Sequence, residues 1–318
     1  MTKHESLLRI IGTGVAVPER ILGNRELRLT RNPSVDEEWV AEKLGIRQRH
    51  IAEDGVFTSD LAAAAVQSTL RQAGVNSDSI DLLIVATATP DRQAPATACL
   101  TQAKAGLSNA VAFDVSAVCS GFLFALTTAA SFIEAGRVKR AMVVGADTFS
   151  RITDWSRKDC VFFGDGAGAV LVERTTHENS FFDAELFSDG TGSDVFTVMP
   201  GERTFTMQAG GVRVAAASAV PRCMKAVMER NHVAPDDIDI VIPHQPSITL
   251  LRELAERSGM PFERFRTNMD RYANTAGATI PILLHETVES GDVKPNDLIM
   301  FAAAGAGFTA GAALYRWH

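Results

Sequence analysis

The chain has 318 residues, of which 46% are hydrophobic and 22% are charged, as expected for a globular protein with two domains or one large duplicated domain. Its formal net charge of −7 excludes a global basic field for nucleic acid or anionic membranes, although it leaves room for a local basic patch. No run approaches the roughly 18 apolar residues of a membrane span, and residues 1–12 lack the features of a signal peptide.

Predicted strands and helices alternate along the first half of the chain. Apolar runs bounded by turn residues predict strands, and amphipathic or small-residue runs that end at glycine predict helices. Strands are predicted over 7–17, 80–87, 112–115, 141–147 and 163–173. Helices are predicted over 36–44, 61–72, 99–105 and 122–134. The Gly12-Thr-Gly14 pattern is not a dinucleotide-binding fingerprint, because Pro18 stands where a helix would have to open.

The second half repeats this alternation after a polar, glycine-rich excursion over 174–211. Pro221 lies inside the first predicted helix and is expected to kink or break it. Helices are predicted over 212–231, 248–257 and 280–290, and strands over 238–244, 298–304 and 310–316.

The two halves resemble each other. Residues 75–85 align with 233–243 at a shift of 158 (233 minus 75), and the strand at Ala141 matches the strand at Leu298 at nearly the same shift. This repeat predicts an α/β protein of two pseudo-symmetric halves, residues 1–174 and 175–318. Matching strand ends of two such halves meet at one central site.

Cys119 stands where a predicted strand turns into a helix. There it faces the positive end of the helix, which favours the nucleophilic thiolate and suits acyl transfer. The alternative is a small buried hydrophobic residue. Among the other cysteines, Cys99, Cys160 and Cys223, there is no paired spacing, so the sequence predicts neither a zinc site nor disulfides. We expect a cytoplasmic protein with reduced thiols.

Three further segments carry candidate chemistry. His244 follows a strand in Pro-His-Gln-Pro-Ser247 and is expected to face a crevice, although a surface histidine is the alternative. Asn274 is expected either at the site or as a helix cap. Residues 304–311, Ala-Gly-Ala-Gly-Phe-Thr-Ala-Gly, form a small-residue turn that suits an oxyanion hole or a simple hairpin.

Taken together, these segments resemble the thiolase-fold condensing enzymes, and among them the beta-ketoacyl-acyl carrier protein synthase III family. The resemblance spans nearly the whole chain. It depends on Gly12-Thr-Gly14, Glu38-Trp39, Gly45-Ile-Arg-Gln-Arg-His50, Phe113-Asp-Val-Ser-Ala-Val-Cys-Ser-Gly121, Phe163-Gly-Asp-Gly-Ala-Gly168, Pro243-His-Gln245, Asn274-Thr275 and Gly307-Phe-Thr309. It implies a layered α-β-α-β-α fold with central mixed sheets.

The resemblance also implies a reaction that needs no metal and no cofactor beyond the acyl-CoA substrate. Cys119 would attack an acyl-CoA thioester and hold the acyl group. His244 and Asn274 would stabilise the enolate formed when malonyl-acyl carrier protein loses carbon dioxide. The N–H groups of Cys119 and Ala306 would form the oxyanion hole for acyl transfer.

Substrate-binding residues and partners follow from the same resemblance. Trp39 and Arg157 would sandwich the CoA adenine, and Ser247 would line the substrate site. The family is homodimeric, and Ala94 of the partner subunit would close the acyl pocket. The docking patch for acyl carrier protein is weak and mixed in charge, with Thr249, Arg252, Glu256 and Arg257 on the helix that follows His244.

Several positions depart from the family pattern. Ala304 and Ala310 replace the usual aromatic residues, and Ala94 replaces a Phe or Thr. These small side chains predict an acyl substrate larger than acetyl. They also raise an alternative, an acyltransferase that passes the acyl group to a hydroxyl or amine with His244 as general base. A catalytically idle subunit is a third possibility, which the presence of Cys119 disfavours.

Overall fold

Two mixed β-sheets form the centre of the computed structural model, which describes residues 8–177 and 179–318. In the first sheet β4 runs parallel to β5 and β6, and the other pairs are antiparallel. Its strands, in spatial order, are β1 (Leu8–Ala16), β7 (Asp165–Arg174), β6 (Arg140–Thr148), β4 (Leu82–Ala86) and β5 (Val111–Val115).

The second sheet repeats the order of the first. β11 and β12 are parallel, β12 and β13 form an antiparallel hairpin, and β8 pairs with the far side of β13 as β1 pairs with β7. Its strands, in spatial order, are β11 (Ile240–Pro243), β12 (Leu298–Gly305), β13 (Thr309–Arg316) and β8 (Phe182–Ser188). All strands of the first sheet lie within residues 8–174, and all strands of the second lie within residues 182–316.

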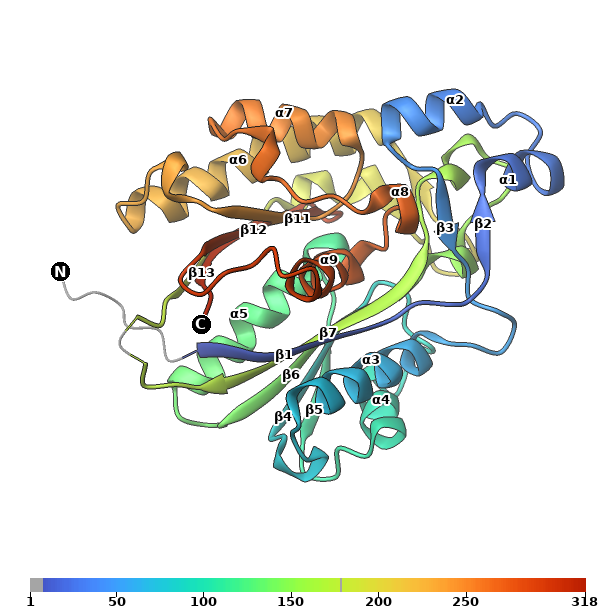
Figure 1. Ribbon diagram of the computed structural model, residues 1–318. Helices are drawn as coiled ribbons and strands as arrows, with labels where there is room; N and C mark the ends of the chain where they lie inside the picture. Colours follow the sequence, from blue (N-terminus) through green and yellow to red (C-terminus); the bar gives the residue numbers. More distant parts are fainter. Residues whose placement is uncertain (1–7, 178) are drawn as a thin grey trace.

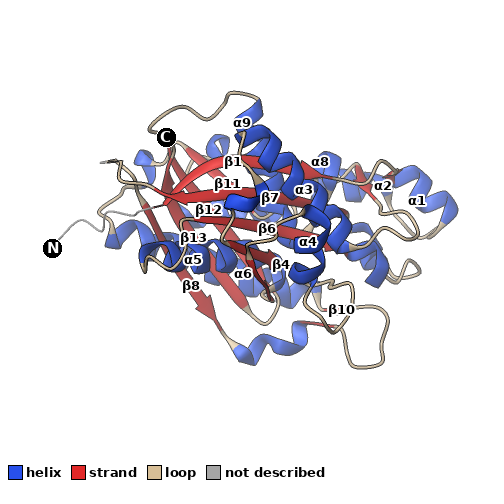
Figure 2. Ribbon diagram, turned by 90° about the horizontal axis from the view of Figure 1, so that it is seen from below, coloured by secondary structure: helices blue, strands red, loops and turns tan. Residues whose placement is uncertain are grey.

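Helices cover both sheets and fill the space between them, which gives the five layers predicted from the sequence (Figures 1 and 2). Helices α5 (Gly121–Glu134) and α9 (Thr279–Glu289) lie in the middle layer. Helix α5 is apolar on nearly every side because it packs against both sheets. The outer layers are α3 (Thr58–Ala73) with α4 (Thr97–Ala105), and α6 (Ala209–Arg230) with α7 (Ile248–Ser258).

Gly14 of β1 lies directly under helix α3. A Cβ atom at this position would lie 2.5 Å from the backbone nitrogen of Thr69, so only glycine allows the helix to approach the strand this closely. The Gly12-Thr-Gly14 pattern therefore serves packing, in agreement with the sequence argument against a dinucleotide site.

Smaller elements surround the sheets. They are the hairpins β2 (Ile21–Gly23) with β3 (Gln48–His50) and β9 (Phe196–Thr197) with β10 (Thr206–Met207), the helices α1 (Asn24–Thr30), α2 (Glu37–Trp39) and α8 (Met269–Tyr272), and the π-helical turn η1 (Val40–Leu44). Short 3-10 turns complete the chain: η2 (Ser77–Ser79), η3 (Val118–Ser120), η4 (Phe149–Ile152), η5 (Lys158–Val161), η6 (Gly190–Val195), η7 (Pro235–Asp237), η8 (Phe262–Arg264) and η9 (Ala276–Ala278).

The structure adds elements that the sequence did not predict, including α1, α8, the two small hairpins and strand β8. The 174–211 excursion contains the edge strand β8, whose residues are only half-buried and therefore lack a strong apolar signal. Helix α6 continues through Pro221 as one element. In the described part of the chain, no helix is long and apolar enough to cross a membrane.

Candidate active site

Cys119 occupies a strained turn between β5 and α5. It lies in η3, and the preceding Val118 has φ = 46°, a left-handed conformation that costs energy for a β-branched residue. The turn is held by its surroundings: the backbone N–H and the hydroxyl of Ser120 both donate to the Ala117 carbonyl. This geometry fixes the thiol at the start of α5, as the sequence predicted.

The protonation state of that thiol differs from the sequence expectation. Burial raises the pKa of the Cys119 thiol well above its usual range, and the negative charge of Asp147 raises it further. Hydrogen bonds from the Cys119 backbone and the Asn274 side chain oppose the rise without reversing it. In the substrate-free site, desolvation therefore outweighs the helix terminus, and Cys119 is a neutral thiol at neutral pH.

His244 and Asn274 form a hydrogen-bonded pair. His244 follows β11, and its Nε2 lies 3.0 Å from Asn274 Oδ1. The backbone N–H of Ala276 also donates to this oxygen, at 2.8 Å, which identifies it as the amide oxygen. His244 Nε2 must therefore carry a proton, and the Asn274 amide nitrogen is left to donate toward Cys119.

His244 is neutral at physiological pH. Burial lowers the pKa of its imidazole to about 4, and the hydrogen bond with Asn274 only partly opposes this shift. A neutral imidazole N–H and an amide N–H beside the thiol are two hydrogen-bond donors without net charge. Such donors stabilise an anion that develops on a carbonyl oxygen.

The glycine turn between β12 and β13 contacts the turn of Cys119 directly. A Cβ atom on Gly305 would lie 2.4 Å from the Ala117 carbonyl oxygen and 2.9 Å from the Ser120 nitrogen. The hydroxyls of Ser120 and Thr309 are 2.8 Å apart and join the same two segments. Ala306 follows Gly305 and lines the same cleft as Cys119.

A cleft of about 480 Å³ leads from the surface to these residues. Trp39, which is 46% exposed, lies at its mouth, and Ser247 and Ala304 form part of its wall. Three further apolar side chains line the cleft: Phe163, from one of the family motifs, and Phe196 and Met207, which the sequence did not mark. Two of them come from the 174–211 excursion, where no periodic signal marked them as part of a site.

Two predicted substrate-binding residues are outside the residues that line the cleft. Arg157 forms an ion pair with Asp159 and donates to the Phe205 carbonyl oxygen at 3.1 Å. Ala94 is exposed on the loop between β4 and α4. Both residues were assigned from the family resemblance, and the single chain does not bring either to Cys119.

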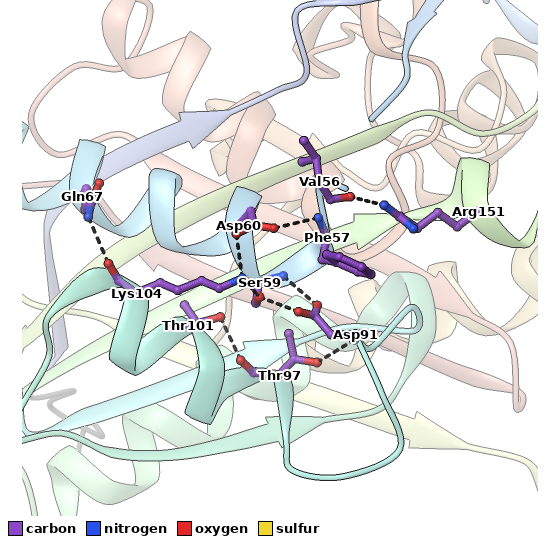
Figure 3. Close-up of polar contacts among 10 residues, drawn as sticks. All are labelled: Val56, Phe57, Ser59, Asp60, Gln67, Asp91, Thr97, Thr101, Lys104 and Arg151. Carbon is purple, nitrogen blue, oxygen red and sulfur yellow. Dashed lines mark hydrogen bonds and ion pairs between the residues drawn. The ribbon is translucent and has the colours of Figure 1, made fainter. Parts of the chain in front are cut away.

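The loop that carries Ala94 is anchored to α3 (Figure 3). Asp91 accepts hydrogen bonds from the Ser59 hydroxyl, at 2.5 Å, and from the Ser59 backbone N–H, at 2.9 Å. Lys104 of α4 donates to Ser59 and to Asp60, each at 2.6 Å. This network fixes both ends of the loop, while residues 92–95 remain exposed.

The candidate site contains nothing that resembles a metal centre. Among residues 8–177 and 179–318, no group of three or more His, Cys, Asp or Glu side chains is placed to hold a metal ion. All four cysteines are free, and Cys99 is the exposed one. The groups that the cleft does offer are a thiol, two hydrogen-bond donors and backbone N–H groups.

Comparison with known proteins identifies the family of this chain. Models of the 3-oxoacyl-[acyl-carrier-protein] synthase III family match residues 113–190, and models of the C-terminal part of that family match residues 228–317. The chain is 43% identical to a beta-ketoacyl-[acyl-carrier-protein] synthase III of Erythrobacter litoralis, over 97% of this chain and 98% of that protein.

Solved structures show the same relationship. The 3-oxoacyl-[acyl-carrier-protein] synthase III of Aquifex aeolicus superposes with a TM-score of 0.93 at 36% identity, covering 98% of this chain and 100% of that one. The enzyme of Pseudomonas aeruginosa superposes with a TM-score of 0.92 at 32% identity, covering 98% of each chain. The protein described here is therefore a thiolase-fold condensing enzyme and belongs to the beta-ketoacyl-[acyl-carrier-protein] synthase III family.

Proposed function

We propose that Cys119 accepts an acyl group from acyl-CoA and that His244 and Asn274 then drive a decarboxylative condensation with malonyl-acyl carrier protein. The observation that carries this proposal is the convergence of the thiol and two neutral donors, the His244 ring N–H and the Asn274 amide, in one apolar-walled cleft. Their roles also match those that the family resemblance implies.

In the first step the Cys119 sulfur attacks the thioester carbonyl carbon, and the CoA thiol leaves with the proton that Cys119 gives up. The oxyanion that forms on the way is held by the N–H groups of Cys119 and Ala306. The raised pKa of the thiol means that proton loss accompanies attack, because a free thiolate is scarce in the empty site.

In the second step the carbon–carbon bond to the malonyl carboxylate breaks, and its electron pair forms an enolate as carbon dioxide leaves. The Asn274 amide donates to the enolate oxygen, and the His244 Nε2–H, which donates to Asn274 Oδ1 in the substrate-free site, is proposed to share its hydrogen with the same enolate oxygen. The enolate carbon then attacks the acyl-Cys119 carbonyl, and the thiolate leaves and takes up a proton. The products are a beta-ketoacyl thioester, carbon dioxide and free enzyme.

Binding of the substrates involves further residues and a second copy of the chain. Trp39 is placed to contact the CoA adenine at the mouth of the cleft. Arg157 is proposed as its partner once CoA is bound. Dimerisation is proposed through strand β5, which lies at the edge of the first sheet and exposes Val111. The partner's Ala94 would then close the acyl pocket with a small side chain and admit primers larger than acetyl.

A second candidate function is acyl transfer to a hydroxyl or amine without decarboxylation. The observation that favours it is Ala304, which lines the cleft with a small side chain where the family resemblance implies an aromatic one. In that reaction His244 would have to accept a proton, which requires loss of the Nε2 proton that its pairing with Asn274 now holds. The tautomer inferred from the hydrogen bonds of Asn274 therefore supports condensation as the first proposal.

The test is intact protein mass after mixing with a panel of acyl-CoAs, followed by a chase with malonyl-acyl carrier protein. We expect an adduct on Cys119 that the chase clears with release of carbon dioxide and a beta-ketoacyl product. An adduct that survives the chase but is cleared by an alcohol or amine supports the second candidate. A protein that forms no adduct with any acyl-CoA contradicts both.

A further inference from the structure

Asp147, at the end of strand β6, is a buried charged residue with no role in the reaction described above. Its side chain is 0% exposed. In the part of the chain that the structure describes, its oxygens accept hydrogen bonds from N–H and O–H donors and form no ion pair. Burial raises the pKa of this carboxyl to about 6, so it is ionised at neutral pH.

The two carboxylate oxygens of Asp147 hold two different loops. Oδ1 accepts from the backbone N–H groups of Ala88 and Thr89, at 2.8 and 3.1 Å, and from the hydroxyls of Thr87 and Thr89, at 3.1 and 2.9 Å. Oδ2 accepts from the backbone N–H of Gly277 at 2.9 Å. The carboxylate thus joins the loop after β4, in the first half of the chain, to the segment that carries Asn274 in the second.

The Gly277 contact bears directly on the orientation of Asn274. The Asn274 side-chain oxygen accepts from the N–H of Ala276, a residue held at φ = 48°, and Gly277 is the next residue. Gly277 also packs tightly, because a Cβ atom on it would lie 3.1 Å from Asp147 Oδ2 and 3.3 Å from the Ala86 carbonyl oxygen. A shift of Gly277 must therefore move the Asn274 amide and, through it, the hydrogen bond to His244.

The charge of Asp147 does not help the thiol. Its carboxylate raises the pKa of Cys119 and so disfavours the thiolate that the loading step needs. Any contribution of Asp147 to the reaction must therefore come through the geometry of Asn274 and His244 rather than through activation of Cys119.

We propose that Asp147 is a positioning residue for the second step, because its bond to the Gly277 N–H fixes the Asn274 amide in the orientation that receives the enolate. This inference builds on the proposed function and adds a residue to it. Its consequence is that loading and condensation depend on Asp147 to different degrees.

The Asp147→Asn variant separates the two steps. An amide keeps the shape of the carboxylate but has only one accepting oxygen. That oxygen should face the four donors of the loop after β4, which are the N–H groups of Ala88 and Thr89 and the hydroxyls of Thr87 and Thr89. The NH₂ group of the new side chain then faces the Gly277 N–H. Two donors cannot form a hydrogen bond with each other, so the Asn274 segment should move away from position 147. We expect condensation to fall at least about tenfold, while acyl loading changes by less than about threefold. Labelling of Cys119 by iodoacetamide at pH 7 should become faster, because a negative charge near the thiol is lost.

Asp114→Asn is the matched control. Asp114 is half-buried, and like Asp147 it accepts a backbone N–H on each carboxylate oxygen, from Thr97 at 2.7 Å and from Ala98 at 2.6 Å, but these bonds hold helix α4 rather than the Asn274 segment. This variant should lower stability without changing the ratio of the two steps. Gly277→Ala disturbs the hydrogen bond between Gly277 and Asp147 from the Gly277 side, and it should likewise lower condensation more than loading. This second variant tests the proposal if Asp147→Asn fails to fold.

A readout that is independent of the reaction distinguishes this inference from the proposed function. Amide hydrogen exchange of a peptide covering residues 274–278 should become at least about tenfold faster in Asp147→Asn and remain unchanged in Asp114→Asn. Unchanged exchange in that peptide, or equal losses in loading and condensation, would overturn the positioning role. Wild-type protein that releases no carbon dioxide from malonyl-acyl carrier protein would instead refute the proposed function, and the exchange measurement would still decide the role of Asp147.

Discussion

Gly305→Ala should impair acyl loading without unfolding the protein. Gly305 begins the turn after β12, in contact with the turn that carries Cys119, and the new methyl group would lie 2.4 Å from the Ala117 carbonyl oxygen. Two backbone segments meet here, so no side chain can rotate away to make room. The turn with the Ala306 N–H must therefore move relative to the nucleophile.

The size of this movement follows from the contact distance. An ordinary contact of a Cβ atom begins at 3.4 Å, so the segments must separate by about 1 Å (3.4 minus 2.4). A misplacement of about 1 Å at a reacting centre costs roughly 100-fold in rate. Crowding of this kind costs about 1–3 kcal/mol of stability, which a folded domain of this size tolerates.

Single-turnover loading measures the effect directly. Wild type and variant are mixed with the best acyl-CoA from the panel, quenched and weighed as intact protein. Gly190→Ala is the control, because a Cβ atom at Gly190 meets no atom within 4 Å. Loading of Gly305→Ala at the wild-type rate, with a native melting transition, would refute the assignment of this turn to the oxyanion hole.

Three further predictions test the site. Cys119→Ala should form no acyl adduct, whereas His244→Ala should load acyl groups but release no carbon dioxide on the malonyl chase; equal loss of loading in both variants would contradict the division of roles. The pKa of His244 is near 6.5 in the unfolded chain and about 4 in the folded chain, so the unfolded chain binds the proton first as the pH falls. Wild type should therefore lose up to about 3 kcal/mol of its free energy of unfolding between pH 6.5 and pH 4. Denaturant titrations of His244→Ala should show a smaller loss over the same pH range. Ala94→Phe should shorten the longest acyl group accepted in the mass assay, with Ala94→Ser as control; an unchanged range would exclude Ala94 from the acyl pocket.

Much of the fold follows from local patterns in the sequence. The buried strands β4, β6 and β12 consist mainly of continuous apolar runs. Helices end at glycines in the left-handed conformation, at Gly74, Gly106 and Gly259. Strand β8 could not be found in this way because it is half-buried at a sheet edge, where polar residues are tolerated.

The meeting of Cys119, His244 and Asn274 in one cleft was predictable from the sequence, but the electrostatics of the site was not. Cys119, His244 and Asn274 stand at the ends of recognisable elements, and the repeat placed those ends together. The pKa of the thiol depends on desolvation at the bottom of the cleft and on the charge of Asp147, which is 28 positions away along the chain (147 minus 119). No local pattern reports either of these long-range effects.

The division of the site between the two sheets has a consequence for how the enzyme loses activity. Cys119 follows a strand of the first sheet, whereas His244 and the glycine turn follow strands of the second, and Asn274 bridges the two because its main chain pairs with Phe162 and Gly164 while its side chain bonds His244. Slight slippage between the halves would separate nucleophile from donors while leaving every strand and helix intact. Heat or mild denaturant should therefore abolish turnover before circular dichroism records any loss of secondary structure. Turnover then reports on the contact between the two halves more sensitively than secondary structure does.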